Sequence, residues 1–201
     1  MYKRQILFIG IGSFTLFAQQ RDHRTREYIA PVRIVWLQDS SRITGANHLL
    51  VPGNGQSDLA NNRLCVLKST PTEHPALLLD FGKELQGGLQ LVTGMPPSHD
   101  PVSVRVRFGE SVSEAMCEID GANGASNDHA MRDFVVSLPW LGVQEIGNSG
   151  FRFVRIDVLG DSTELQLKEV RAISTFRDIP YLGSFRCNDE RLNRIWKTGA
   201  Y

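Results

Sequence analysis

Residues 102–108 read Val-Ser-Val-Arg-Val-Arg-Phe, so apolar and polar side chains alternate with a period of two. Successive side chains of a β-strand point to opposite faces of a sheet, and this segment therefore predicts a strand with one buried and one solvated face. Such strands are typical of antiparallel sheets that pack on one side only. The segment restricts the fold to one built from layered antiparallel sheet.

Further segments carry weaker forms of this pattern, and turn-forming residues separate them. The expected strands are residues 32–37, 76–81, 89–93, 134–138, 151–159 and 164–173, and the expected turns contain residues 87–88, 95–97, 121–124, 147–150 and 160–161. We find no segment of helical period before the C-terminus. The pattern predicts an all-β fold, an antiparallel β-sandwich of the jelly-roll type over residues 31–182, with a closed barrel as the alternative.

One long segment, residues 38–62, does not fit this series of strands. It is rich in Gly, Asn, Ser and Asp, and it holds only a short apolar island at residues 49–51. We expect it to form long loops across the sandwich. Loops of this length often carry functional contacts.

The C-terminal residues predict a short helix. Asn188 is placed to cap it, and Asp189 and Glu190 would lie in its first turn, where negative charge complements the helix dipole. One apolar stripe follows at helical spacing and consists of Leu192, Ile195, Trp196 and Gly199. A stripe of this kind needs a partner layer, which either the sandwich or a helical domain beyond Tyr201 would supply.

The first 18 residues predict a secretory signal peptide. Lys3 and Arg4 precede an apolar run at residues 6–17, and Ala18 is a small residue at the expected cleavage site. The run is shorter than the roughly 20 residues that a membrane-spanning helix needs, so we expect no transmembrane anchor. A buried N-terminal strand or helix is the alternative. We therefore expect an exported protein, either periplasmic or extracellular.

The first five residues, Met1 to Gln5, read MYKRQ and resemble the translation of an adapter used in DNA sequencing. Whether they are native is open, and the apolar run and Ala18 do not depend on them.

The charge pattern excludes nucleic-acid binding as the expected function. The sequence has 22 basic and 22 acidic residues, and its Lys and Arg residues form no stripe. Proteins that bind nucleic acid through phosphates concentrate positive charge on one surface. Arg105 and Arg107 are expected on the outer face of the strand at residues 102–108.

Cysteines and possible metal ligands give weak patterns. Cys65, Cys117 and Cys187 are compatible with one disulfide or with three small buried thiols; the sequence assigns no pairing, and we favour buried thiols. The histidines are too scattered for a zinc site. Asp128, His129 and Asp133 could hold calcium together with backbone oxygens, but hydrogen-bonding loop residues are the favoured interpretation. We therefore expect no bound metal.

Trp140 is the candidate carbohydrate-binding residue. It follows Pro139 at the end of an expected strand. An aromatic ring exposed on the rim of a sandwich can stack on a sugar, because the ring has an apolar face and a polar edge. A position in the core is the alternative interpretation, and tryptophans occupy it more often.

Five strings resemble, in order, the N-terminal β-sandwich region of bacterial α-L-rhamnosidases of glycoside hydrolase family 78. The strings are LLLDFGKELQGGLQL, VRVRFGESVSEAM, NDHAMRDFVVSLPWLG, GFRFVRIDVL and RDIPYLGSFRCNDERLNRIWKTGAY. In that family the last string joins the sandwich to an (α/α)6 barrel that carries the catalytic carboxylates. The resemblance implies an inverting enzyme without an organic cofactor that releases terminal α-L-rhamnose from a rhamnose-containing glycan. It also implies that residues 183–201 are a linker and the first helix of a catalytic barrel that continues beyond Tyr201.

The carboxylates of this chain do not form a recognisable catalytic pair. An inverting glycosidase needs an acid and a base carboxyl group roughly 6.5 to 9.5 Å apart. Glu110 and Glu114 are expected to be solvated turn residues, and Asp189 and Glu190 are explained by the helix start. The remaining candidates are Asp80, Glu84, Asp128 and Asp133. We assign no catalytic residue to this chain and expect the catalytic residues beyond Tyr201.

Two functional interpretations remain from the sequence. In the first, the chain is the accessory sandwich of a rhamnosidase-like enzyme and packs against the α-helical barrel of the same protein. In the second, it is an autonomous carbohydrate-binding or adhesion β-sandwich. They differ in the region expected beyond Tyr201, since only the first requires an all-α region with acidic motifs.

Overall fold

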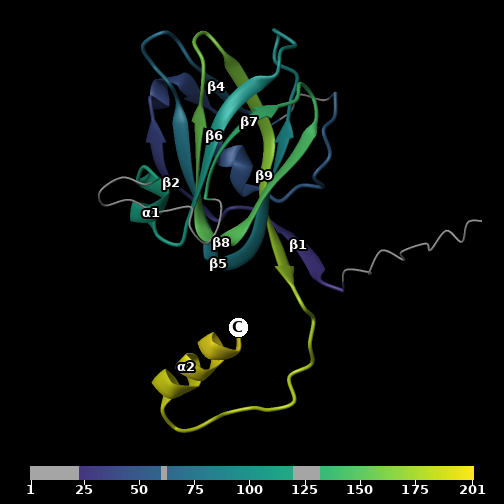
Figure 1. Cartoon of the computed structure of the whole chain (residues 1–201), viewed down its shortest axis with the longest axis vertical. Coiled ribbons are helices and arrows are strands. Elements are labelled where there is room, and N and C mark those ends of the chain that lie inside the picture. The colour runs from purple at the N-terminus through teal and green to yellow at the C-terminus, as the bar shows by residue number, and fades with distance from the viewer. Residues whose placement is uncertain (1–22, 60–62, 120–131) are drawn as a thin grey trace, which may run out of the picture.

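A computed structural model describes residues 23–59, 63–119 and 132–201 of the chain (Figure 1). Its strands are β1 (Thr25–Ile29), β2 (Arg33–Gln38), β3 (Ile43–Thr44), β4 (Cys65–Lys68), β5 (Ala76–Thr93), β6 (Val102–Gly109), β7 (Asp133–Leu138), β8 (Val143–Val158) and β9 (Glu164–Phe176). Its helices are α1 (Val112–Met116), α2 (Glu190–Ala200) and the 3-10 turns η1 (Ser40–Arg42) and η2 (Ala46–Leu50).

The strands form an antiparallel β-sandwich, as the sequence predicts. In one layer β2, the first part of β5, the last part of β8, β6 and β7 pair in that order. In the other layer β3, β4, β9, the last part of β5 and the first part of β8 pair in that order, and β1 joins β9 beyond β4. The two ends of this path, β3 and β7, do not pair with each other, so the closed barrel is excluded.

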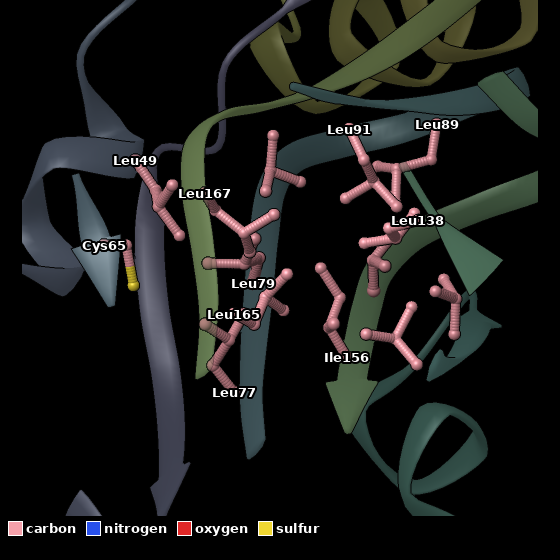
Figure 2. Packing of buried hydrophobic residues seen from close by; sticks show 14 of the residues in the cluster. Leu49, Cys65, Leu77, Leu79, Leu89, Leu91, Leu138, Ile156, Leu165 and Leu167 are labelled. Atoms are coloured by element: carbon pink, nitrogen blue, oxygen red, sulfur yellow. The ribbon is translucent and has the colours of Figure 1, made fainter. Parts of the chain in front are cut away.

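The core lies between the two layers and confirms the alternation that predicts β6. Val102, Val104, Val106 and Phe108 are all buried. The expectation that the opposite face is solvated is wrong for Arg107, which is 3% exposed because it lies in ion pairs with Asp157 and Glu118. Figure 2 shows leucines from β5, β7 and β9 together with Ile156 of β8 in the same cluster, which also takes in Leu49 and Cys65. Burial of these side chains is the main stabilising term of the fold.

Two glycine-rich segments that predict turns lie inside strands instead. Residues 87–88 belong to β5 and residues 147–150 belong to β8, and the pairing of these strands shifts register between Gly87 and Leu89. Gly87 has φ 148°, and a Cβ atom there would lie 1.9 Å from the carbonyl oxygen of Ile173. Glycine in a strand allows a bulge and a close approach of neighbouring backbone, so here it bends a strand without ending it.

Several short elements were not predicted. β1 precedes residue 31 and pairs with the end of β9, and its mainly exposed side chains explain the lack of an alternating pattern. The segment at residues 38–62 contains η1, β3 and η2 in addition to loops. α1 has five residues, too few for a helical period, and the hydroxyl of its cap Ser111 accepts a hydrogen bond from the amide of Glu114. The expected turn at residues 121–124 lies outside the described residues.

The C-terminal helix is confirmed as α2, with its cap one residue later than expected. The carboxylate of Asp189, and not Asn188, accepts hydrogen bonds from the amides of Arg191 at 2.8 Å and Leu192 at 3.4 Å. Asp189 takes this role because its side chain reaches the unpaired amides of the first turn. Figure 1 shows α2 below the sandwich, joined to β9 by an extended segment.

The three cysteines form no disulfide. Cys65 is buried in the core, as expected, and burial raises the pKa of its thiol to about 12. Cys117 and Cys187 are only partly buried, so the expectation of three buried thiols is wrong for these two.

Candidate functional site

A concave feature of the described residues lies where β5 and β8 pass from one layer of the sandwich to the other. We call this region the corner, and it comprises residues 81–86 of β5 and 147–152 of β8. The C-terminal segment returns beneath it and encloses a cavity of about 800 Å³. Its lining combines the aromatic rings of Phe176, Tyr181 and Tyr201 with the polar side chains of Lys83, Glu84 and Gln86. Volumes of this order are typical of small-molecule sites.

Direct contacts hold the end of α2 at the corner. The Tyr201 hydroxyl donates a hydrogen bond to the backbone carbonyl of Glu84 at 2.8 Å. The Lys83 ammonium lies 5.1 Å from the centroid of the Tyr201 ring, within the range of a cation–π contact. The Tyr181 hydroxyl donates to the carbonyl of Ala200, which ties the linker to the last turn of the helix. The corner therefore orients α2 relative to the sandwich.

The other side chains of α2 make a different surface. Leu192, Ile195 and Trp196 of its apolar stripe are 47%, 58% and 38% exposed. The sandwich does not cover this stripe, although the sequence left that possibility open. The helix is thus fixed at its C-terminal end and presents an apolar face that no described residue buries.

Three carboxylates gather at the corner. A Cβ atom on Gly150 would lie 3.5 Å from Glu84 Oε1 and 3.6 Å from Glu110 Oε1, so these two oxygens are at most about 7 Å apart. Arg132 bridges Glu110 at 3.1 Å and Glu114 at 3.3 Å. Glu110 is 57% exposed on its side chain, as expected for a turn residue, whereas Glu114 is more enclosed at 24%.

Among the described residues, Glu84 is the one carboxyl group with a raised pKa. Burial is the largest cause, and the negative charge of Glu110 adds to it. Both effects disfavour the ionised form of Glu84.

Among the described residues, the most buried carboxylates pair with arginine. Asp80 pairs with Arg152, Asp133 with Arg105, Asp157 with Arg107, and Glu169 with Arg171. A general acid must be free to donate a proton to the sugar oxygen, and these four carboxylates are instead bound by guanidinium groups. These four carboxylates therefore stabilise the fold.

Asp80 gives this network a measurable pH dependence. Its side chain is 2% exposed and accepts hydrogen bonds from Arg152, Arg33 and the amide of Gly82 at 2.7 to 2.8 Å. These contacts, that of Arg152 above all, lower the pKa of Asp80 to about 2. Since the folded pKa lies below the unfolded one, the stabilisation is complete above about pH 4 and is lost as the pH falls through about 2.

Replacement of Asp80 with asparagine tests this dependence. We expect Asp80→Asn to lower the free energy of unfolding by about 2 kcal/mol at pH 6, because the ion pairs are lost while the oxygen facing Gly82 remains. The difference from the unmodified chain should shrink toward zero near pH 2. Urea unfolding across this pH range measures it, and a difference that stayed constant with pH would contradict the assignment.

Trp140 lies at the C-terminal end of β5, away from the corner. Its indole Nε1 donates a hydrogen bond to the carbonyl of Pro96 at 3.2 Å, and its ring lies 4.7 Å from the ring of His99, tilted by 49°. The side chain is partly buried and holds the loop that follows β5. Sugar contact by Trp140 stays a prediction.

The possible calcium ligands are not brought together in the part of the chain that the structure describes. Asp128 and His129 lie outside it, and Asp133 binds the Arg105 guanidinium through both carboxylate oxygens. No group of three His, Cys, Asp or Glu side chains with metal-binding geometry occurs among the described residues. None of their helices is long and apolar enough to cross a membrane.

Comparison with solved structures places the fold among known proteins. A rhamnosidase from Klebsiella oxytoca with rhamnose bound is 18% identical with a TM-score of 0.56, over 86% of this chain and 33% of that one. The GH78 family rhamnosidase of Bacillus sp. GL1 is 20% identical with a TM-score of 0.52, over 76% of this chain and 14% of that one.

The chain thus spans one third or less of these two rhamnosidases. No protein-family model and no curated protein matches the sequence. The likeness is one of fold, and it shows that a β-sandwich of this kind occurs as one part of a larger rhamnosidase.

Proposed function

We propose that this chain is the non-catalytic accessory sandwich of a glycoside hydrolase similar to α-L-rhamnosidases. The exposed apolar stripe of α2 carries the proposal, since a helix held at the corner with Leu192, Ile195 and Trp196 uncovered requires a partner layer. In the proposed enzyme α2 is the first helix of an α-helical barrel, and residues 183–189 are the linker. The barrel supplies the catalytic carboxylates, which release terminal α-L-rhamnose from a glycan with inversion.

The chemistry of the described residues supports a non-catalytic role. The buried carboxylates are paired with guanidinium groups, and Glu110 is bound by Arg132 close to Glu84. A water-activating base and a protonated acid on opposite sides of a sugar require two carboxyl groups in different environments. The two carboxyl groups near Glu84 at the corner, Glu110 and Glu114, are both bound by Arg132 and are not free to activate water.

Export is part of the same proposal. A signal peptide at residues 1–18, cleaved after Ala18, would deliver the enzyme to the periplasm or the medium. Glycans with terminal rhamnose would meet the enzyme there.

The alternative is an autonomous carbohydrate-binding or adhesion sandwich. The aromatic and polar lining of the corner cavity favours it, because sugars stack on aromatic rings and exchange hydrogen bonds with polar side chains. The reading frame beyond the Tyr201 codon separates the two proposals. An all-α region with acidic motifs supports the enzyme, whereas a stop codon or another sandwich supports the binding protein.

The isolated chain provides a second test. We expect the purified 201-residue chain to release no nitrophenol from a nitrophenyl α-L-rhamnoside. Absorbance of the released nitrophenol measures this, with an active rhamnosidase as the positive control. Clear turnover by the chain alone would contradict the proposal that the sandwich is non-catalytic.

A further inference from the structure

The corner cavity has two walls that come from different parts of the chain. One wall belongs to the sandwich and includes Lys83, Glu84, Gln86 and Gly150. The other wall consists of residues 177–182, which follow β9, and of the last two residues, Ala200 and Tyr201. A molecule in this cavity would therefore contact the sandwich, the segment after β9 and the end of α2 at the same time.

Tyr181 and Tyr201 form oriented aromatic surfaces in the cavity. The hydroxyl of Tyr201 donates to the carbonyl of Glu84, and the hydroxyl of Tyr181 donates to the carbonyl of Ala200. Each ring is thus held by its polar edge, while Tyr181 stays 72% exposed and Tyr201 stays 70% exposed. Oriented rings with exposed surface suit stacking on the C–H face of a sugar, because little conformational freedom is lost on binding.

The sandwich wall offers acceptors for hydroxyl groups. The carboxylate of Glu84 has no hydrogen-bond or ion-pair partner among residues 23–59, 63–119 and 132–201. Gly150 carries no side chain, and a Cβ atom there would lie 3.5 Å from Glu84 Oε1 and 3.8 Å from Gln86 Oε1. The space beside Gly150 is therefore open, and a ligand hydroxyl placed in it can donate to either oxygen.

The charged side chains of the lining come close to cancelling one another. Glu27, Glu84 and Asp178 are acidic, whereas Lys83 and Arg177 are basic. A strongly charged ligand of either sign would meet like charges in this cavity. A neutral hydroxylated ring avoids that repulsion, because its hydroxyl groups donate to carboxylates and accept from an ammonium group.

From this arrangement we propose that the corner cavity binds a neutral sugar unit of a glycan between the sandwich and α2. Tyr181 stacks on the sugar ring, Glu84 and Gln86 accept hydrogen bonds from its hydroxyl groups, and Lys83 donates to one of its oxygens. Because this ligand contacts both walls, it also fixes the last turn of α2 on the sandwich. The inference rests on the proposed role on glycans and adds a non-catalytic sugar site to it.

Calorimetric titration of the 201-residue chain tests the ligand class. The probes are the methyl glycosides of L-rhamnose, D-glucose and D-galactose, and the comparison ligands are sorbitol and methyl glucuronide. At least one neutral glycoside is expected to bind about tenfold more tightly than sorbitol, because only a closed ring offers a C–H face for stacking. Absence of neutral glycoside binding, equal binding of sorbitol, or tighter binding of the glucuronide than of the glucoside overturns the proposal.

A matched pair of variants tests the role of the Tyr181 ring. Tyr181→Ala should weaken binding of the neutral glycoside about tenfold, whereas Tyr181→Phe, which keeps the ring, should retain most of the affinity. Phe185→Ala is the control, because Phe185 is a 44% exposed ring in the same part of the chain and does not line the cavity. Equal affinity of Tyr181→Ala and Phe185→Ala, or an equal loss in Tyr181→Phe and Tyr181→Ala, overturns the assignment.

A methyl group at position 150 tests the sandwich wall. Gly150 has no positive φ, and the added Cβ atom meets its nearest neighbours at ordinary contact distance, so Gly150→Ala should fold normally. It should weaken binding of the neutral glycoside at least threefold, because it fills the space beside Glu84 and Gln86. Gly183→Ala is the control outside the cavity, and thermal unfolding verifies that both variants are folded. Unchanged affinity of folded Gly150→Ala would overturn the placement of the sugar at this wall.

Amide NMR spectra locate the ligand independently of any variant. On titration with the neutral glycoside, the signals of Gly150, Tyr181 and Tyr201 should shift, and hydrogen exchange in the last turn of α2 should slow. Shifts confined to residues outside the cavity would overturn the proposal. In the proposed enzyme the barrel hydrolyses a simple rhamnoside without the corner cavity, so the proposed function and the sugar site can fail separately.

Discussion

Replacement of Gly87 with alanine is expected to destabilise the sandwich by about 3 kcal/mol or more. The added Cβ atom would lie 1.9 Å from the carbonyl oxygen of Ile173, and the backbone has φ 148°, a conformation that side chains rarely adopt. Relief of the contact would force β5 away from β9, where the two strands pair from residue 87 onward. The cost therefore combines steric overlap, backbone strain and weakened pairing.

Urea unfolding followed by circular dichroism measures this effect, with Gly183→Ala and Gly199→Ala as controls. A Cβ atom at either control position meets no atom within 4 Å. The controls should change the free energy of unfolding little. A Gly87→Ala variant as stable as the controls would mean that the bulge in β5 is not as described.

Replacement of Phe151 with alanine is the second change with a large expected effect, a loss of about 3–5 kcal/mol. Phe151 is fully buried at the corner. The centroid of its ring lies 5.9 Å from the ring centroid of Phe81 and 4.7 Å from that of Phe108. Truncation leaves a cavity that strands fixed by pairing on both sides cannot close. Because small domains are stable by only about 5–15 kcal/mol, the variant should be close to unfolding.

Phe185→Ala is the matched control, since Phe185 is 44% exposed in the linker before α2. Thermal unfolding of both variants should show a large decrease in Tm for Phe151→Ala and a small one for Phe185→Ala. Equal decreases would contradict the position of Phe151 in the core.

The sequence predicted most of the longer strands, and it did so most clearly where side chains alternate. Val102 to Phe108 is the clearest case, because one face of β6 lies in the core and the other carries Arg105 and Arg107 in ion pairs with Asp133 and Asp157. Alternation of apolar and polar residues is enough to predict a strand when one of its faces lies in the core and the other does not. It fails for β1, whose side chains are mostly exposed.

The glycine-rich segments show a second limit of local pattern. Glycine favours turns and also permits bulges, and the choice depends on the neighbouring strand. At Gly87 that neighbour is Ile173, which lies 86 positions later in the sequence. Pairing of this kind is not visible in a single segment of chain.

The sequence identified the corner carboxylates one by one, but it did not predict that they lie close together. Glu84 and Glu110 belong to the neighbourhood of different strands, and only the bend of β5 and β8 brings both to Gly150. The proximity of Arg26 to Glu145 has the same origin, because β1 pairs with β9. By contrast, the helix at residues 190–200 was predicted almost to the residue, since caps and apolar spacing are local signals.

The central proposal is that this sandwich and α2 are part of an inverting enzyme similar to rhamnosidases. Its most direct test is proton NMR of the sugar released from a nitrophenyl α-L-rhamnoside by the protein of the complete reading frame. The proposed enzyme releases the β-anomer of L-rhamnose first, before mutarotation, because water attacks from the face opposite the leaving group. Release of the α-anomer first, or no release of rhamnose, would contradict it.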